Sequence, residues 1–234
     1  MKNIIYALPT ILQRFIWPGT RAVLSFFSCF SIIGARQLEN LPKGLVFAPN
    51  HSSELDPILV PAALPFFSRH LGMFYTSREK KYYINSGWRQ LLYGGWFFKI
   101  WGAYPVQTGV QNYEVSLKHH IKLLENLKSV CIFPEGKTTQ TGKIGEAKGG
   151  VGYLTWRTGK PIIPVTIVGT YKMGLKDFFL RKRNITIIFG SPVYWKDIFP
   201  GNKKPEISLT HDDCRVAAQK IMNTVSDTLK SFTS

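Results

Sequence analysis

The sequence has few acidic residues, only three cysteines, and no uncharged run of the length that a bilayer-spanning helix needs. Its 14 Asp and Glu residues oppose 30 Lys and Arg residues, which gives a formal net charge of +16. An excess of this size indicates a polyanionic partner, either nucleic acid or an anionic membrane surface. The cysteines lie far apart, so neither a disulfide framework nor a metal-ligand spacing is apparent. This pattern is typical of a reducing compartment.

The N-terminal segment is apolar but short of a full membrane span. Its longest uncharged stretch, residues 22–35, has 14 residues, whereas a spanning helix needs about 20. Pro9 and Pro18 interrupt the apolar residues, and no convincing signal-peptide cleavage site follows them. The segment therefore differs from both a transmembrane helix and a secretory leader.

Two apolar helices, 4–16 and 20–34, are predicted instead, joined at 17–19 into a hairpin. Aromatic and arginine side chains flank them, as in helices that lie in a membrane interface. We therefore predict that residues 1–36 associate with a membrane. The alternative is a hydrophobic hairpin packed on the protein's own core.

The remaining residues, 37–234, have the length of one α/β domain. Apolar runs predict strands at 45–50, 72–79, 103–106, 129–136, 160–169 and 184–190. Helices are predicted at 57–64, 111–127, 148–158 and 209–232, and aromatic-rich helical or irregular sequence at 80–100. Strands that alternate with helices indicate a mostly parallel central sheet flanked by helices.

Polar residues follow two of the predicted strands directly. The sequence NHSSELD follows the strand at 45–50, and PEGKTT follows the apolar residues 130–133. Ligand sites of open α/β sheets lie at the carboxyl ends of their strands. If the two strands are neighbours, His51, Asp56 and Glu135 converge on one site, together with Lys137.

A histidine and a carboxylate that lie close together form a general base and its orienting partner. The imidazole takes a hydroxyl proton, while the carboxylate fixes its tautomer through the other ring nitrogen. His51 and Asp56 are five residues apart, so a turn must bring Asp56 back toward the ring. The alternatives are that His51 is incidental and that Asp56, followed by Pro57, is a helix N-cap. Capping and orienting are compatible, because the two carboxylate oxygens can serve different donors.

Other chemistries find little support in the sequence. It has no G-x-S-x-G nucleophile elbow, and the glycine that a P-loop requires is replaced by Cys131. No dinucleotide fingerprint occurs in a strand-to-helix setting. The other histidines, His70, His119, His120 and His211, are predicted to be surface or boundary residues. Acyl transfer by a general base, without a covalent intermediate, is the most economical interpretation.

Four blocks of the sequence resemble the glycerolipid acyltransferases, which include bacterial lysophosphatidate acyltransferase. NHSSELD (50–56) resembles the H-x-x-x-x-D motif, and FPEGKTT (133–139) resembles F-P-E-G-[TS]-R-S. GAYPVQTG (102–109) and IIPV (162–165) fall where the family has its second and fourth blocks, in the same order.

The resemblance implies a site and its substrates. His51 would be the base that deprotonates the acceptor hydroxyl, and Asp56 would orient it. Glu135 and Gly136 would shape the acceptor site. The acyl donor would be a thioester on coenzyme A or acyl carrier protein, and the family needs neither a metal nor another cofactor. Its bacterial members commonly rest on the membrane through apolar N-terminal helices.

Two positions depart from the family pattern. Thr108 and Thr138 stand where the family has arginines that ordinarily hold the phosphate of the acceptor. Threonine cannot supply a bidentate cationic donor. Lys137, Lys143 and Lys148 are nearby and would supply point charges instead. Otherwise the acceptor is not a simple phosphomonoester, and Lys143 and Lys148 are solvated loop charges.

We therefore predict a membrane-associated O-acyltransferase on the cytoplasmic face of the cell membrane, which acylates a lysophospholipid of the lysophosphatidate type. A second hypothesis keeps the fold but assigns a non-phosphomonoester lipid acceptor. A third is a basic, non-catalytic protein that binds lipid or nucleic acid. No nucleic-acid recognition motif is present, so no nucleic-acid partner is predicted. The basic run 181–183, next to aromatic residues, suits either anionic lipid headgroups or a solvated turn.

Overall fold

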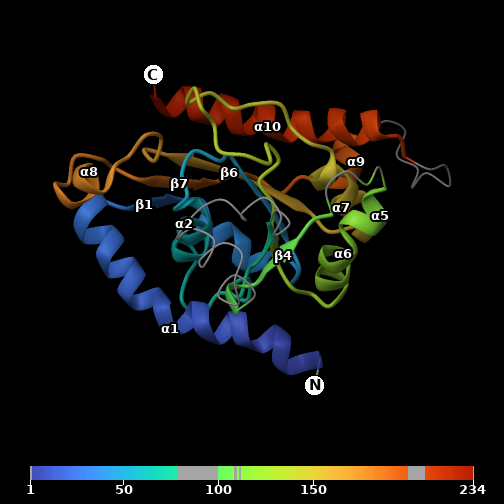
Figure 1. The fold of residues 1–234 in the computed structure, drawn as a ribbon, viewed down its shortest axis with the longest axis horizontal. Helices are drawn as coiled ribbons and strands as arrows, with labels where there is room; N and C mark the ends of the chain where they lie inside the picture. The colour runs from blue at the N-terminus through green and yellow to red at the C-terminus, as the bar shows by residue number, and fades with distance from the viewer. Residues whose placement is uncertain (1, 78–99, 108–109, 111, 200–208, 234) are drawn as a thin grey trace.

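The described part of the chain forms one seven-stranded sheet with helices on both faces (Figure 1). The computed structural model describes residues 2–77, 100–107, 110, 112–199 and 209–233. The strands are β1 (Ser31–Ile33), β2 (Val46–Pro49), β3 (Phe74–Ser77), β4 (Ala103–Pro105), β5 (Val130–Cys131), β6 (Ile162–Val168) and β7 (Thr186–Phe189). Their order in the sheet is β1-β7-β6-β2-β5-β3-β4.

Five adjacent strands, from β6 to β4, run parallel to one another. Strand β7 is antiparallel to β6, and β1 is parallel to β7. The predicted mostly parallel sheet flanked by helices is therefore confirmed. The sequence pattern did not predict β1, and it did not reveal the reversed direction of β7.

The helices and helical turns are α1 (Lys2–Ser28), η1 (Ala35–Asn40), α2 (Asp56–Ala63), α5 (Tyr113–Ser116), α6 (Lys118–Glu125), α7 (Gly150–Thr158), α8 (Leu175–Phe179), α9 (Trp195–Ile198) and α10 (His211–Thr233). The predicted helix 111–127 is divided at Leu117 into α5 and α6. The segment predicted at 80–100 lies almost entirely outside the described residues.

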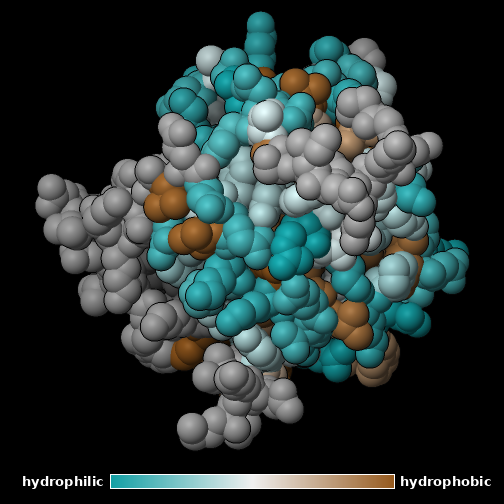
Figure 2. All heavy atoms as spheres, turned by 90° about the vertical axis from the view of Figure 1, so that its right-hand side faces the viewer, coloured by the Kyte–Doolittle hydropathy of each residue, from teal (hydrophilic) through white to brown (hydrophobic). Residues whose placement is uncertain are grey.

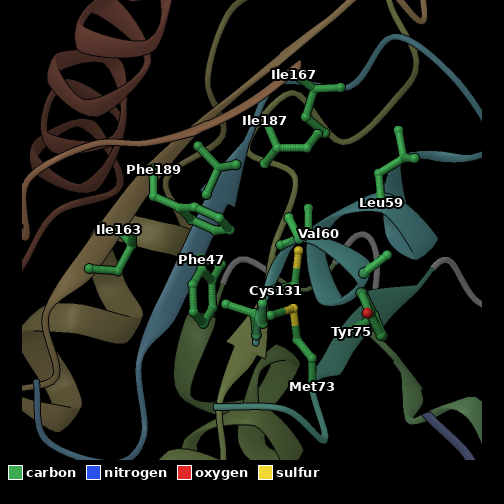
Figure 3. Packing of buried hydrophobic residues seen from close by; sticks show 14 of the residues in the cluster. Phe47, Leu59, Val60, Met73, Tyr75, Cys131, Ile163, Ile167, Ile187 and Phe189 are labelled. Carbon is green, nitrogen blue, oxygen red and sulfur yellow. The ribbon is translucent and has the colours of Figure 1, made fainter. Parts of the chain in front are cut away.

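Side chains alternate between two apolar clusters, one on each face of the sheet. Phe47 points into one cluster with α1, η1 and α2, whereas its neighbours Val46 and Ala48 point into the other with α6, α7 and α10. Figure 3 shows the first cluster, in which Val60 of α2 lies beside Cys131 of β5. The two clusters make the fold a three-layer α/β/α arrangement.

The N-terminal segment is one helix and not a hairpin. Helix α1 continues for 27 residues through Pro9 and Pro18, and residues 31–33 of the predicted second helix belong to the sheet. A proline removes a helical hydrogen bond and normally interrupts a helix. Here tertiary hydrogen bonds hold α1 on the domain on both sides of Pro18.

These tertiary bonds come from three polar side chains of α1. Gln13 is 2% exposed, and its amide donates to Met73 O and accepts from Met73 N. Trp17 donates to Leu64 O at 3.0 Å, and Arg21 donates to Ala62 O at 2.7 Å. The last two bonds satisfy carbonyls at the C-terminal end of α2. One side of α1 is therefore part of the domain.

The other side of α1 is exposed and apolar. Ile11 is 63% exposed, Phe15 84% and Phe26 57%.

Figure 1 shows α1 along the lower left of the molecule, with α8 near its C-terminal end and α10 on the far side of the sheet. Figure 2 shows the right-hand side of the molecule, away from α8, where hydrophilic side chains predominate. Among the helices that the structure describes, none has the length and apolarity required to span a bilayer.

Candidate functional site

The candidate site lies where three neighbouring strands end. His51 follows β2, Glu135 follows β5 and Thr170 follows β6, and these strands are adjacent in the sheet. All three run in the same direction, so the residues that follow them meet at one edge. The backbone of the first two loops is joined directly, because Thr139 N donates to His51 O at 2.8 Å.

Asp56 is a fully buried carboxylate with four hydrogen-bond donors. Its Oδ2 atom accepts from His51 Nδ1 at 2.9 Å, from Ser52 N at 2.7 Å and from Ser53 N at 2.8 Å. Its Oδ1 atom accepts from Thr170 Oγ1 at 3.2 Å. A buried charge is expensive unless hydrogen bonds compensate it, and these four donors do so.

The N-cap interpretation of Asp56 is wrong. The N-cap residue of α2 is Leu55, and Asp56 is already inside the helix, with Pro57 after it. The carboxylate turns backward, onto the amides of the loop 52–53, and not forward onto the first helical turn. This backward turn brings Asp56 to the His51 ring, which the five-residue separation requires.

The ring of His51 is held on two sides. Its Nδ1 donates to Asp56, which leaves Nε2 as the ring nitrogen able to accept a proton. Phe133 stacks on the ring, with centroids 4.2 Å apart. The side chain of His51 remains 17% exposed, and within the described ranges no hydrogen bond engages Nε2. His51 therefore presents one accessible nitrogen in a fixed orientation.

Glu135 connects His51 to a second loop. Its carboxylate is buried; Oε1 accepts from His51 N and Oε2 accepts from Gly145 N, both at 2.9 Å. Glu135 thus fixes the backbone on which the histidine is mounted. Gly136, the next residue, has a φ of 66°, a conformation that favours glycine.

The predicted lysines differ in their relation to this site. The ammonium of Lys148 lies over Gly136, 2.8 Å from where a β-carbon would be. Lys137 and Lys143 are exposed, and only the backbone of Lys143 takes part in the loop, as the acceptor for Thr139 Oγ1. Thr138 lines a pocket beside the site. Thr108 lies outside the described residues.

Three residues of the site were missed by reasoning from the sequence. Thr170 supports Asp56, and Phe133 covers the His51 ring. Asn50 is buried and exchanges two hydrogen bonds with the backbone of Ile167 in β6, which continues the pairing of the strands to the point where His51 begins. Phe133 and Asn50 are the first residues of the two quoted blocks, whereas Thr170 is far from both blocks in the sequence.

The thiol of Cys131 lies beneath the site but is not activated. Burial, followed by the charge of Asp56, raises the pKa of this thiol well above its usual value. A thiol of this kind stays protonated and is a poor nucleophile at neutral pH. Among the described residues, no group of three or more His, Cys, Asp and Glu side chains is arranged to hold a metal ion.

Two other histidines are buried, contrary to the prediction of surface or boundary positions. His70 is 1% exposed and bonds through Nε2 to Leu38 O; His120 is 0% exposed and bonds through Nε2 to Tyr75 O. Burial lowers the pKa of both, to about 4 for His120. They are neutral core residues on the two faces of the sheet, whereas His119 and His211 are exposed.

The fold and the site together define an α/β protein with a histidine–aspartate pair at the carboxyl edge of its parallel strands. The family model described as Acyltransferase matches residues 33–168, which is more than half of the chain. The chain belongs to this acyltransferase family.

Two relatives and one solved structure illustrate the similarity. The chain is 28% identical, over 195 residues, to the chloroplastic 1-acyl-sn-glycerol-3-phosphate acyltransferase BAT2 of Brassica napus. This match covers 81% of this chain and 50% of the relative. It is also 28% identical to a probable 1-acyl-sn-glycerol-3-phosphate acyltransferase of Mycoplasma pneumoniae, over 66% of this chain and 59% of the relative. The chain thus spans about half the length of the curated relatives it matches.

The crystal structure of the 1-acyl-sn-glycerophosphate (LPA) acyltransferase PlsC from Thermotoga maritima has a similar fold. The TM-score is 0.63, and the match covers 95% of this chain and 81% of that one. The two sequences are 18% identical, so the comparison concerns the fold alone.

Proposed function

We propose that the protein transfers a fatty acyl chain from a thioester, on coenzyme A or acyl carrier protein, to the free hydroxyl of a lysophospholipid. The observation that carries the proposal is the contact between His51 Nδ1 and the buried carboxylate of Asp56. This contact leaves Nε2 of an accessible imidazole as a base. The relatives named 1-acyl-sn-glycerol-3-phosphate acyltransferases support a lysophosphatidate-type acceptor.

The proposed reaction needs one base and no covalent intermediate on the protein. His51 Nε2 takes the hydroxyl proton as the oxygen attacks the thioester carbonyl, and Asp56 stabilises the imidazolium that forms. The carbon–oxygen bond of the ester forms and the carbon–sulfur bond breaks. The proton passes from the imidazolium to the departing sulfur, so the products are an ester and a thiol.

We also propose that the reaction takes place on the cytoplasmic face of a membrane, with α1 in contact with lipid. The exposed stripe of Ile11, Phe15 and Phe26 supplies an apolar surface, and the +16 net charge favours anionic lipid. At the end of this stripe, Arg181 donates to Phe26 O and lies over the Phe26 ring, so the basic segment 181–183 adjoins the apolar one.

The alternative acceptor is a lipid without a phosphomonoester, because Thr108 and Thr138 replace the arginines expected there. A product-resolved assay decides between the two. It crosses lysophosphatidate, other lysolipids and uncharged monoacylglycerol with acyl-CoA and acyl carrier protein donors. The proposal expects phosphatidate as the preferred product. A preference for uncharged acceptors would support the alternative, and no thioester-dependent acylation of any acceptor would leave only a binding role.

A further inference from the structure

A small pocket lies beside His51, between the loops that follow the three central strands. Its volume is about 270 Å³, and its walls include Ser52, Thr138, Thr170 and Lys172. Pockets for drug-sized ligands have volumes of about 300–1,000 Å³ and mostly apolar walls. This pocket is smaller, and most of the residues that line it bear hydroxyl groups or charges, so it offers hydrogen-bond partners to a polar headgroup.

The pocket shares a wall with the catalytic pair. The Ser52 and Thr170 hydroxyls are 2.6 Å apart, and Thr170 in turn donates to Asp56. Thr138 is adjacent to Thr139, whose amide donates to the carbonyl of His51. Ser52 also follows His51 directly in the sequence, so the pocket adjoins the candidate base.

Lys172 is the one cation among the described residues that line this pocket. Its ammonium lies over the Tyr171 ring, 5.3 Å from the centroid, and Tyr171 is anchored by a hydrogen bond from its hydroxyl to Gln140 O. The backbone of Lys172 has a φ of 52°, which is uncommon for a residue with a side chain. Lys172 therefore lines the same pocket as Thr138, one of the two positions where an arginine is missing.

We propose that this pocket binds the phosphate of the lysophospholipid acceptor and that Lys172 supplies the charge that Thr108 and Thr138 cannot. The inference rests on the proposed function and assigns a residue that determines its substrate specificity. Lys137, Lys143 and Lys148, although close in sequence to the motifs, do not line the pocket. A lysine acts as a point charge, so the phosphate needs no bidentate geometry.

Glu54 is the one carboxylate among the described residues that line the pocket, and its charge is opposite to that of Lys172. A phosphomonoester carries a charge of about −1.5 to −2 at neutral pH. Glu54 therefore disfavours the ligand that Lys172 favours. Removing each charge should shift the affinity for a phosphate in opposite directions, which a general effect on folding would not do.

The test compares Lys172→Met with Lys176→Met, which removes the same charge from an exposed position in α8 outside the pocket. We expect Lys172→Met to raise the KM for lysophosphatidate about tenfold, because the phosphate loses one charge-assisted hydrogen bond. Its KM for monoacylglycerol should be unchanged, and Lys176→Met should resemble the wild type. Glu54→Gln should lower the KM for lysophosphatidate.

Coenzyme A also carries phosphates, so the assay varies the donor as well. A raised KM for acyl-CoA with a normal KM for lysophosphatidate would assign the pocket to the donor and overturn the proposal. Direct titration with sn-glycerol 3-phosphate tests binding without turnover. Equal binding by wild type and Lys172→Met, or none by the wild type, would also overturn it. A wild type that binds this ligand but acylates no lysolipid would instead contradict the proposed function.

Discussion

The buried carboxylate of Asp56 accepts hydrogen bonds from two separate loops. Two backbone amides and His51 come from its own loop, and Thr170 comes from the loop after β6. Thr170 is 1% exposed, so no water replaces its hydroxyl readily if it is removed. The orientation of the His51 ring should therefore depend on a residue outside both motifs.

Thr170→Val tests this dependence, because it keeps the shape of the side chain and removes the hydroxyl. We expect kcat to fall about tenfold, and the free energy of unfolding to fall by about 1–3 kcal/mol, since a buried acceptor loses its donor. Thr170→Ser should restore kcat. Thr166→Val is the control: Thr166 is buried on β6 and bonds to Val225 O on α10. It should lose stability but keep kcat, and equal kcat losses in both variants would refute the role of Thr170.

The buried histidines make stability depend on pH. Burial lowers the pKa of His120 to about 4, below its ordinary value of 6.5. Between these values the unfolded chain binds a proton that the folded chain does not, so stability is full above pH 6.5 and is lost as the pH falls toward 4. The loss from this residue is on the order of 3 kcal/mol, and His70 contributes with the same sign.

Unfolding by urea at several pH values measures this effect. His120→Gln keeps an N–H donor for Tyr75 O and removes the titration, so its free energy of unfolding should depend less steeply on pH between 6.5 and 4. His119→Gln changes the exposed neighbour, whose charge lowers the pKa of His120 less than burial does, so its slope should stay close to that of the wild type. An unchanged slope in His120→Gln would show that His120 is not the group responsible.

At the scale of secondary structure, the packing of α7 on α10 depends on the absence of a side chain. A β-carbon on Gly152 would lie 2.7 Å from Cys214 O and 3.1 Å from the Ala217 β-carbon. The first contact is with backbone, which cannot rotate away. The close packing of α7 on α10 holds α10 against the face of the sheet opposite α1.

Gly152→Ala should therefore lower the free energy of unfolding by about 1–3 kcal/mol, the usual cost of overpacking. Gly19→Ala is the matched control, since nothing lies within 4 Å of its β-carbon position in α1. Alanine favours a helix interior by about 1 kcal/mol over glycine, so the control should be neutral or stabilising. Equal effects of the two substitutions in urea unfolding would contradict the packing argument.

The elements that the sequence predicted are those with a strong local pattern. The buried runs at β2, β5 and β6 and the periodic helix α10 were found because burial on both faces, or a 3.6-residue repeat, leaves a clear signal. The continuity of α1 was not predictable, because it depends on the bonds of Gln13, Trp17 and Arg21 to distant carbonyls. Thr170 was missed for the same reason: its role comes from the pairing of β6 with β2.

At the scale of the whole molecule, charge and apolar surface should act together on a membrane. A double variant, Ile11→Ser with Phe15→Ser, removes two exposed side chains whose burial in lipid is worth about 1.5–3 kcal/mol each. We expect binding to anionic vesicles to fall by at least about tenfold, and binding of the wild type to weaken with rising salt. Val216→Ser, at a position of α10 that is 58% exposed, should bind as the wild type. Equal losses in both variants would exclude α1 as the contact.

The central claim is that His51 is the base of an acyl transfer. His51→Ala should fold, bind vesicles as the wild type does, and lose about 100- to 10,000-fold in kcat for lysophosphatidate acylation, the usual contribution of a general base. Turnover near that of the wild type, on every lysolipid tested and with folding and vesicle binding intact, would contradict the account.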